Sequence, residues 1–245
     1  MANVSEHTDS KRKRLLKKIW KLSKRIFIWF FIAQLFYIIL LKWVNPPITM
    51  TQLVSWVSGH GFKRDYVNRN RISPNAKLAV IAAEDQLFPD HHGFDWKEIK
   101  KAMAYNKRKP GRIHGASTIS QQVAKNIFLW QGRSWLRKGL EVYFTFMIEL
   151  IWGKKRILEL YLNEIEMGEG IFGIEMAAKL YFNKPAKNLT RQEAAMIAAC
   201  LPNPKRYTVK PLSSYVAVRS QWVIEQMNNL QTDPDIQRVI GALPP

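Results

Sequence analysis

The feature that most constrains this chain is an uncharged apolar run at residues 26–41, which directly follows a basic block. The run, IFIWFFIAQLFYIILL, contains twelve Ile, Leu or Phe side chains. Together they favour membrane insertion by about −5 kcal/mol, which outweighs the single Gln34. Lys42 can reach the headgroups, so the apolar stretch extends over residues 26–44, about 28 Å of helix. That length matches a bilayer core and predicts one transmembrane helix.

The two alternatives for this run are a buried core helix and a cleavable signal peptide. A signal peptide ends in a small-residue cleavage site, whereas Lys-Trp-Val-Asn-Pro-Pro follows residue 41. We therefore expect an uncleaved signal anchor. The positive-inside rule then predicts that the basic residues 1–25 stay in the cytoplasm and that the chain after Asn45 lies on the far side of the membrane.

The charge of the chain points to an anionic partner. The formal net charge is +19, which suits either nucleic acid or phosphates at a membrane surface. Residues 1–25 hold nine Lys or Arg against two acidic residues, so +7 of the total is explained by a topology signal that also binds anionic phospholipid. We therefore expect membrane phospholipid, and no nucleic acid, as a partner. The single Cys200 excludes an intramolecular disulfide and a multi-cysteine metal site.

The rest of the chain predicts a mostly α fold without an evident sheet or repeat. Residues 45–72 form a juxtamembrane segment whose aromatic and basic side chains suit a membrane interface, and residues 106–115 look like a mobile loop. We expect a main domain at residues 73–232 and a C-terminal tail at 233–245. Cap patterns and apolar spacing predict helices at about 74–84, 95–105, 117–129, 134–152, 154–164, 172–182, 191–200 and 214–229.

The first chemical cluster is Glu84 and Asp85, at the end of an apolar helix. Burial and a helix C-terminus both disfavour a carboxylate, so we expect the pKa of Glu84 to be raised. Such a group can act as a general acid or base near neutral pH. The alternative is a structural ion pair with an arginine. His91 and His92 are adjacent in the chain and suit capping or packing better than metal binding.

The second cluster is the polar string at residues 115–126. On a helix that begins near Ser117, the side chains of Ser117, Gln121 and Lys125 would share one face. A hydroxyl, an amide and an ammonium there suit a polyhydroxylated or phosphorylated ligand. A solvated helix surface explains the same pattern.

The third cluster places Arg133, Arg137 and Glu141 four residues apart, with Lys138 beside them. The pattern is consistent with a surface salt bridge worth less than about 1 kcal/mol. It is equally consistent with a phosphate clamp in which an acidic group holds an anion through a divalent cation. Two carboxylates, Glu84 and Glu141, flanking a sugar-sized polar face are typical of glycosyl chemistry.

These clusters resemble, in order, the motifs of the peptidoglycan glycosyltransferases, and the resemblance covers about residues 70–230. The departures are Ala116 for a second Gly, Lys155-Arg156 for acidic residues, and Ile224 for Leu. The matching strings are Glu84-Asp85-x-x-Phe88-x-x-His91-x-Gly93, Gly115-x-Ser117-Thr118-x-x-Gln121-Gln122-x-x-Lys125-Asn126, Arg137-Lys138-x-x-Glu141, Ile157-Leu158-Glu159-x-Tyr161-Leu162-Asn163 and Arg219-x-x-x-Val223-Ile224-x-x-Met227.

The resemblance implies a lysozyme-like helical glycosyltransferase domain that polymerises lipid II into β-1,4-linked glycan strands, with release of undecaprenyl diphosphate. It implies that Glu84 is the general base and that Glu141 binds the diphosphate through Mg²⁺ or Mn²⁺ or positions the cations. No organic cofactor is expected, and Glu159 and Asn163 are interpreted as scaffolding. The residues implied to bind substrate are Ser117, Thr118, Gln121, Gln122, Lys125, Arg133, Arg137 and Lys138.

Two other functions share parts of this pattern. A lysozyme-like hydrolase or lytic transglycosylase would use one glutamate but would not need the phosphate clamp. A non-enzymatic membrane-anchored scaffold would use only the basic surface. The chain contains no Lys-Thr-Gly, and its one Ser-x-x-Lys lies in the basic block at Ser10, so we expect the monofunctional branch without a transpeptidase. Other cell-wall synthesis or division proteins are expected partners.

Overall fold

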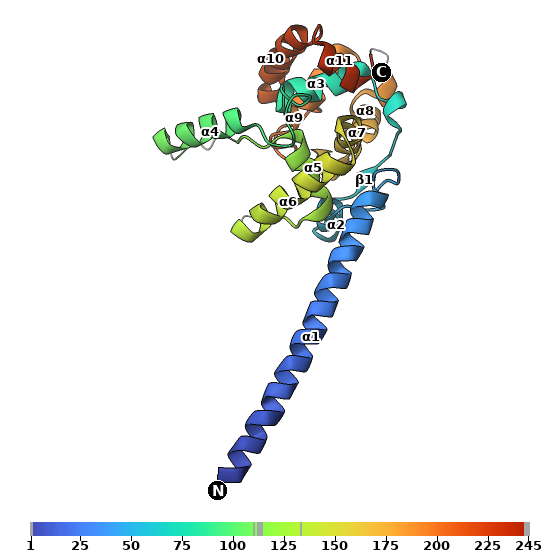
Figure 1. Cartoon of the computed structure of the whole chain (residues 1–245). Coiled ribbons are helices and arrows are strands. Elements are labelled where there is room, and N and C mark those ends of the chain that lie inside the picture. Colours follow the sequence, from blue (N-terminus) through green and yellow to red (C-terminus); the bar gives the residue numbers. More distant parts are fainter. Residues whose placement is uncertain (1, 110, 112–114, 133, 243–245) are drawn as a thin grey trace. The chain divides into compact units, whose positions relative to one another are not determined.

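The chain divides into two units, Met1–Val44 and Asn45–Pro245. A computed structural model describes residues 2–109, 111, 115–132 and 134–242 (Figure 1). The first unit is the helix α1 (Ala2–Leu40), so the basic block expected as a separate tail continues into the apolar run as one helix. Its side chains at Phe27, Trp29 and Phe30 are about 70 % exposed. The span Arg12–Leu40 has the length and hydropathy of a membrane-crossing helix, as the sequence predicted.

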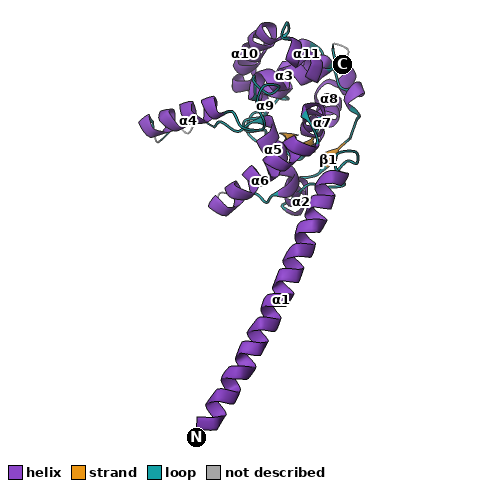
Figure 2. Cartoon of the chain, viewed as in Figure 1, coloured by secondary structure: helices purple, strands orange, loops and turns teal. Residues whose placement is uncertain are grey.

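The second unit is mostly helical (Figure 2). Its helices are α2 (Met50–Val57), η1 (Arg69–Arg71), α3 (Pro74–Glu84), α4 (Trp96–Arg108), α5 (Ile119–Phe128), α6 (Trp135–Ile151), α7 (Lys154–Glu164), α8 (Ile174–Phe182), η2 (Ala186–Asn188), α9 (Arg191–Cys200), α10 (Ser214–Leu230) and α11 (Pro234–Ile240). The mostly α class predicted from the sequence is therefore confirmed.

Polar side chains fix where the helices begin. Ser73 Oγ accepts a hydrogen bond from the backbone N–H of Asn75 at 3.2 Å, and Pro74 follows it as the first residue of α3. Thr190 and Glu193 form the predicted capping box at the start of α9. A capping box of Thr118 and Gln121 starts α5 one residue after Thr118, slightly later than the sequence indicated.

The sequence analysis missed a small sheet. Strand β3 (Ile171–Phe172) lies between β1 (Lys63–Arg64), which is parallel to it, and β2 (Glu166–Gly168), which is antiparallel. Strands of two or three residues are too short to show an alternating pattern, so periodicity could not reveal them.

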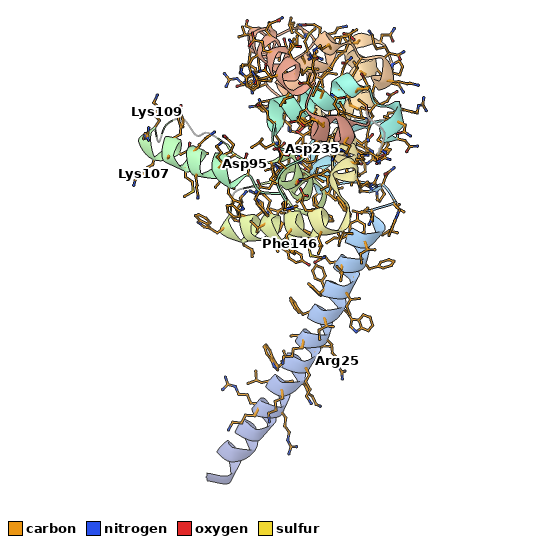
Figure 3. All side chains as sticks on the ribbon, turned by 45° about the horizontal axis from the view of Figure 1, so that its top comes forward. Arg25, Asp95, Lys107, Lys109, Phe146 and Asp235 are labelled. Atoms are coloured by element: carbon orange, nitrogen blue, oxygen red, sulfur yellow. The ribbon has the colours of Figure 1, made fainter. Side chains whose placement is uncertain are left out.

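Two sets of helices build the core of the second unit. Helix α3 packs with α9 and α10, while α5 packs with α6 and α7. Alanines such as Ala79, Ala82 and Ala195 are fully buried on α3 and α9, and their small side chains allow close helix packing. Figures 1 and 3 show α4 projecting from the other helices of this unit, with Lys107 and Lys109 at its outer end.

Two predicted irregular segments contain helix. Helix α4 continues to Arg108, into the expected loop at residues 106–115; residues 110 and 112–114 of that loop lie outside the described residues. The expected tail at 233–245 contains α11, because Asp233 caps the helix and Ile236 and Ile240 are buried. The sequence alone underestimated this helix because it is only two turns long.

Candidate active site

Glu84 is the last residue of α3, where the apolar helix ends. Its Oε2 accepts a hydrogen bond of 2.6 Å from Nε2 of Gln122, on α5. Burial raises the pKa of Glu84, and the neighbouring Asp85 carboxylate raises it further, while the Gln122 hydrogen bond and the cations of Arg219 and Lys125 lower it. The raised pKa agrees with the sequence prediction, and it makes the Glu84 carboxylate a stronger base than an ordinary glutamate.

Tyr161 of α7 fixes the side chain of Gln122. The Tyr161 hydroxyl donates a hydrogen bond of 3.1 Å to Oε1 of Gln122, so the amide nitrogen is the end that faces Glu84. Tyr161 is fully buried, which limits the rotation of both groups. The order Tyr161–Gln122–Glu84 therefore presents an N–H donor to the carboxylate.

Asp85 holds the loop behind Glu84 in place. Its Oδ2 accepts a hydrogen bond of 3.0 Å from the backbone N–H of Ile119, and Nε2 of His91 lies 2.9 Å from its Oδ1. The Gly93 N–H donates to Nδ1 of His91 at 3.1 Å, so the imidazole proton is on Nε2 and points to Asp85. His91 is therefore a structural residue, in agreement with the interpretation that it serves capping or packing.

Gly93 is required by close packing in this loop. Its φ is +89°, and a Cβ added there would lie 2.7 Å from Cγ2 of Thr145. Its carbonyl oxygen accepts a hydrogen bond of 2.7 Å from the Thr118 hydroxyl. The loop after Glu84 is thus tied to the start of α5, the helix that carries Gln122.

A group of cations lies beside this carboxylate. Burial lowers the pKa of Lys125, as do the charges of Arg137 and Lys138, whereas Glu141 and Glu84 raise it. Buried Glu141 accepts hydrogen bonds from Arg137 Nη1 at 3.1 Å and from the Lys138 ammonium. The Nε atom of Arg137 is buried and lacks a hydrogen-bond partner among the described residues. The cluster of Lys125, Arg137 and Lys138 thus has donors left for an anionic ligand.

The residues around Glu141 do not fit a metal site. Both carboxylate oxygens of Glu141 face cationic side chains. Among residues 2–109, 111, 115–132 and 134–242, no group of three or more His, Cys, Asp or Glu side chains has the arrangement of metal ligands. A divalent cation usually takes carboxylate oxygens that are not already neutralised. The role of Mg²⁺ or Mn²⁺ at this site stays a prediction.

The structure corrects the predicted polar face of residues 117–125. Ser117 precedes α5 and is exposed, while Thr118 and Gln121 are buried and bonded to each other as the capping box. The helix starts later than expected because Thr118 is its N-cap. Ser117 therefore does not lie on the helix face of Gln121 and Lys125, and the Gln121 side chain is used in the capping box. Gln122 bonds to Glu84, and the charge of Glu84 acts on Lys125. Arg133 lies outside the described residues, so its predicted role stays a prediction.

Two residues near Glu84 received no role in the sequence analysis. Tyr161 orients Gln122, and the charge of Arg219, on α10, lowers the pKa of Glu84. Arg219 also stacks over Trp222 at 3.6 Å from the ring centroid. Tyr161 lies in the fourth string that resembles the family, and Arg219 lies in the fifth. Their proximity to Glu84 comes from the packing of helices that are far apart in sequence, so no local pattern reveals it.

Glu159 and Asn163 act as scaffold residues, in line with their interpretation from sequence. Asn163 is fully buried and pairs with both backbone groups of Val67, at 2.9 and 3.1 Å. Glu159 accepts from the Arg69 N–H and from Arg156, both at 3.0 Å. These contacts hold the segment before α3 against α7.

Comparisons with known proteins show the family of the chain. The model of the transglycosylase family matches residues 50–228. The biosynthetic peptidoglycan transglycosylases of Escherichia coli (strain K12 / DH10B) and Shigella boydii serotype 4 (strain Sb227) are each 54 % identical to the chain over 191 residues, which cover 76 % of this chain and 78 % of each relative. The matched residues 50–228 contain every side chain described above at the Glu84 site. The chain belongs to the transglycosylase family.

Proposed function

We propose that this chain polymerises lipid II into β-1,4-linked glycan strands, with Glu84 as the general base. The observation that carries the proposal is the hydrogen bond of 2.6 Å from Gln122 to Glu84, beside the cations of Lys125 and Arg137. A base and a set of phosphate-binding cations in one site are what transfer from a lipid diphosphate requires.

In the proposed reaction, the Glu84 carboxylate takes the proton of the 4-hydroxyl group of the acceptor N-acetylglucosamine. The oxygen then attacks the anomeric carbon of the donor N-acetylmuramic acid on the face opposite the diphosphate. The bond from that carbon to the diphosphate oxygen breaks, and its electron pair leaves with undecaprenyl diphosphate. Attack from the opposite face inverts the anomeric carbon and gives the β-1,4 link.

The cation cluster would stabilise the leaving group. Lys125 and Arg137 can donate charge-assisted hydrogen bonds to the diphosphate oxygens as negative charge develops there. Lys138, whose side chain is 44 % exposed, can reach the same anion. Glu141 would act as a positioning residue that holds Arg137 and Lys138, without touching the reacting atoms. We propose that Arg133 also binds the diphosphate, and the support for this role is the resemblance of the chain to the family.

The membrane would present the substrate. We propose that α1 crosses the bacterial cytoplasmic (inner) membrane once, with its N-terminus in the cytoplasm and the second unit on the outer side. Helix α2 exposes Trp56 and Val57, and α6 exposes Trp135, Leu136 and Phe146; this apolar surface supports contact with phospholipid. Other cell-wall synthesis or division proteins remain proposed partners.

The experiment that tests this function compares the two directions of glycosyl chemistry. Purified full-length protein in detergent would be incubated separately with lipid II and with finished glycan strands, and the products separated by gel electrophoresis. We expect polymer from lipid II and no cleavage of finished strands. Cleavage of strands without polymer formation would instead support a hydrolase or lytic transglycosylase. Lack of either reaction would favour the scaffold.

A further inference from the structure

A cavity of about 520 Å³ lies away from the Glu84 site, between the start of α3, the helices α7 and α11, and the segment of η1. Its lining includes Arg69, Lys77, Lys155 and Glu159, and none of Glu84, Gln122, Lys125, Arg137 or Glu141. Lys77 lies seven residues before Glu84 on α3, which corresponds to about 10 Å along the helix. The cavity is therefore separate from the site proposed to transfer the sugar.

Lys77 occupies an unfavourable position in this cavity. It is only 9 % exposed, and its Nζ donates one hydrogen bond, of 3.0 Å, to the carbonyl oxygen of Ile240. It lies in the first turn of α3, where the helix dipole disfavours a cation. Burial lowers the pKa of Lys77 and the charge of Arg69 lowers it further, while the charge of Glu159 raises it. An ammonium group has three donors, so two of them are left for a ligand or for water.

The other charged groups of the cavity leave it positive. The side chains of Arg69 and Lys155 have no ion-pair partner among the residues that the structure describes. Glu159 is the acidic residue of the lining, and its carboxylate is already bonded to the Arg69 N–H and to Arg156. Lys77 is the buried cation among these residues, whereas Arg69 is exposed and Lys155 is half-buried. A buried cation is normally paired, and three cations here face one carboxylate, so an anion would balance the charge of the described lining.

The rest of the cavity wall is apolar in part. Leu158 and Leu162 of α7 face it, as do Ile72 and Val239. A free inorganic ion would leave these walls uncovered, whereas an aliphatic group of a few carbons would bury against them.

We propose that this cavity binds a small amphiphilic anion, in which a carboxylate or phosphate group contacts Lys77, Arg69 and Lys155 and a short aliphatic group packs on Leu158 and Leu162. The two headgroups share the chemistry of an oxyanion that accepts charge-assisted hydrogen bonds. The proposal concerns binding alone and does not depend on the transfer reaction at Glu84.

Calorimetric titration of the full-length protein in detergent tests this site. The probes are hexanoate and hexyl phosphate. Acetate, which lacks the aliphatic chain, tests whether that chain contributes to binding, and hexylammonium, which carries the opposite charge, tests whether the negative charge is needed. We expect saturable binding of at least one hexyl anion, weaker binding of acetate, and no binding of hexylammonium. Whichever of hexanoate and hexyl phosphate binds with the higher affinity identifies the preferred headgroup as a carboxylate or a phosphate. Equal binding of acetate and hexanoate would overturn the aliphatic part, and no binding of either hexyl anion would overturn the site.

Variants locate the binding. We expect the dissociation constant of the hexyl anion to rise at least about tenfold in each of three variants, Lys77→Met, Arg69→Gln and Lys155→Gln. Lys107→Gln is the matched control, because Lys107 is exposed at the outer end of α4 (Figure 3). Arg69→Gln and Lys155→Gln alter exposed or half-buried side chains and keep the test valid if Lys77→Met fails to fold. Unchanged binding in both would place the anion elsewhere and contradict the proposal.

Discussion

Nε2 of Gln122 lies 2.6 Å from Oε2 of Glu84, while Oε1 of the same amide accepts the Tyr161 hydroxyl. One amide thus connects a buried phenol on α7 to the carboxylate at the end of α3. Because the donor end of the amide faces Glu84, the contact favours the ionised form that a general base needs. Burial acts in the opposite direction and dominates, so the pKa of Glu84 is raised overall.

The pH dependence of the wild-type enzyme should follow this balance. Glu84 must be ionised to accept a proton, so polymerisation should fall as the pH drops through its pKa. Because that pKa is raised from the ordinary value of 4.5, the acid limb should lie above pH 4.5. Initial rates of lipid II polymerisation between pH 4 and 9 measure it. An acid limb at or below the ordinary value would show that Glu84 is not the group that titrates.

Tyr161→Phe should disturb Glu84 without touching it. Loss of the hydroxyl frees the Gln122 amide to rotate, so that its oxygen can face the carboxylate, disfavour the ionised form and move the acid limb to higher pH. We expect an activity loss of about tenfold at neutral pH. Tyr181→Phe is the matched control, because Tyr181 is also buried and its hydroxyl donates to the carbonyl of Met167 at 3.0 Å. An equal shift of the pH profile in both variants would contradict a positioning role for Tyr161.

Glu141→Gln should lower both stability and activity, because it removes the negative charge that Arg137 and Lys138 contact. Breaking a buried ion pair by removing one partner costs about 3–5 kcal/mol, and Glu141 is 3 % exposed. We expect a lower free energy of unfolding in denaturant titration and weaker polymerisation. Lys138→Gln should cost less than about 1 kcal/mol, because the Lys138 side chain is 44 % exposed. Stability unchanged in Glu141→Gln would contradict the positioning role.

A chelator titration tests whether the folded chain holds a divalent cation. Since both oxygens of Glu141 are bonded to cations, removal of metal with EDTA should leave the folded stability of the chain unchanged. Thermal unfolding with and without EDTA measures this. A large loss of stability that Mg²⁺ restores would show that the chain itself holds a metal.

His91→Leu should loosen the loop behind Glu84. The variant removes the imidazole that donates to the buried Asp85 carboxylate and accepts the Gly93 N–H. Leaving Oδ1 of Asp85 and the Gly93 N–H without their His91 partner costs about 1–3 kcal/mol, measured as free energy of unfolding. His92→Leu, at an exposed neighbouring position, serves as the control and should leave stability within about 0.5 kcal/mol. Equal effects in the two variants would contradict the proposed Asp85–His91 contact.

Much of the fold follows from local sequence. The apolar run at residues 26–41 predicts the spanning part of α1, and the Ser73-Pro74 and Thr190–Glu193 patterns predict the starts of α3 and α9. These features are predictable because they depend on residues within four positions of one another. The pairing of β1 with β3 joins residues more than a hundred positions apart, such as Lys63 and Ile171, and local patterns contain no trace of it. Strands β2 and β3 are close in sequence but too short to show an alternating pattern.

The candidate site was predictable in its residue types more than in its geometry. Glu84, Gln122, Lys125 and Arg137 follow from the family-like strings, and the structure brings Gln122 to Glu84. The capping role of Gln121 could not be separated from substrate binding by spacing alone, since the same residue suits both. The contact of Tyr161 with Gln122 depends on how α5 packs against α7, which is a tertiary property.

The most direct test of the account is Glu84→Gln in the full-length protein, assayed for polymerisation of labelled lipid II and, separately, for lipid II binding. The amide cannot accept the proton at neutral pH but keeps the size of the side chain, so we predict a loss of polymerisation of about 10²–10⁴-fold with lipid II still bound. Polymerisation at the wild-type rate would contradict the assignment of Glu84 as the general base.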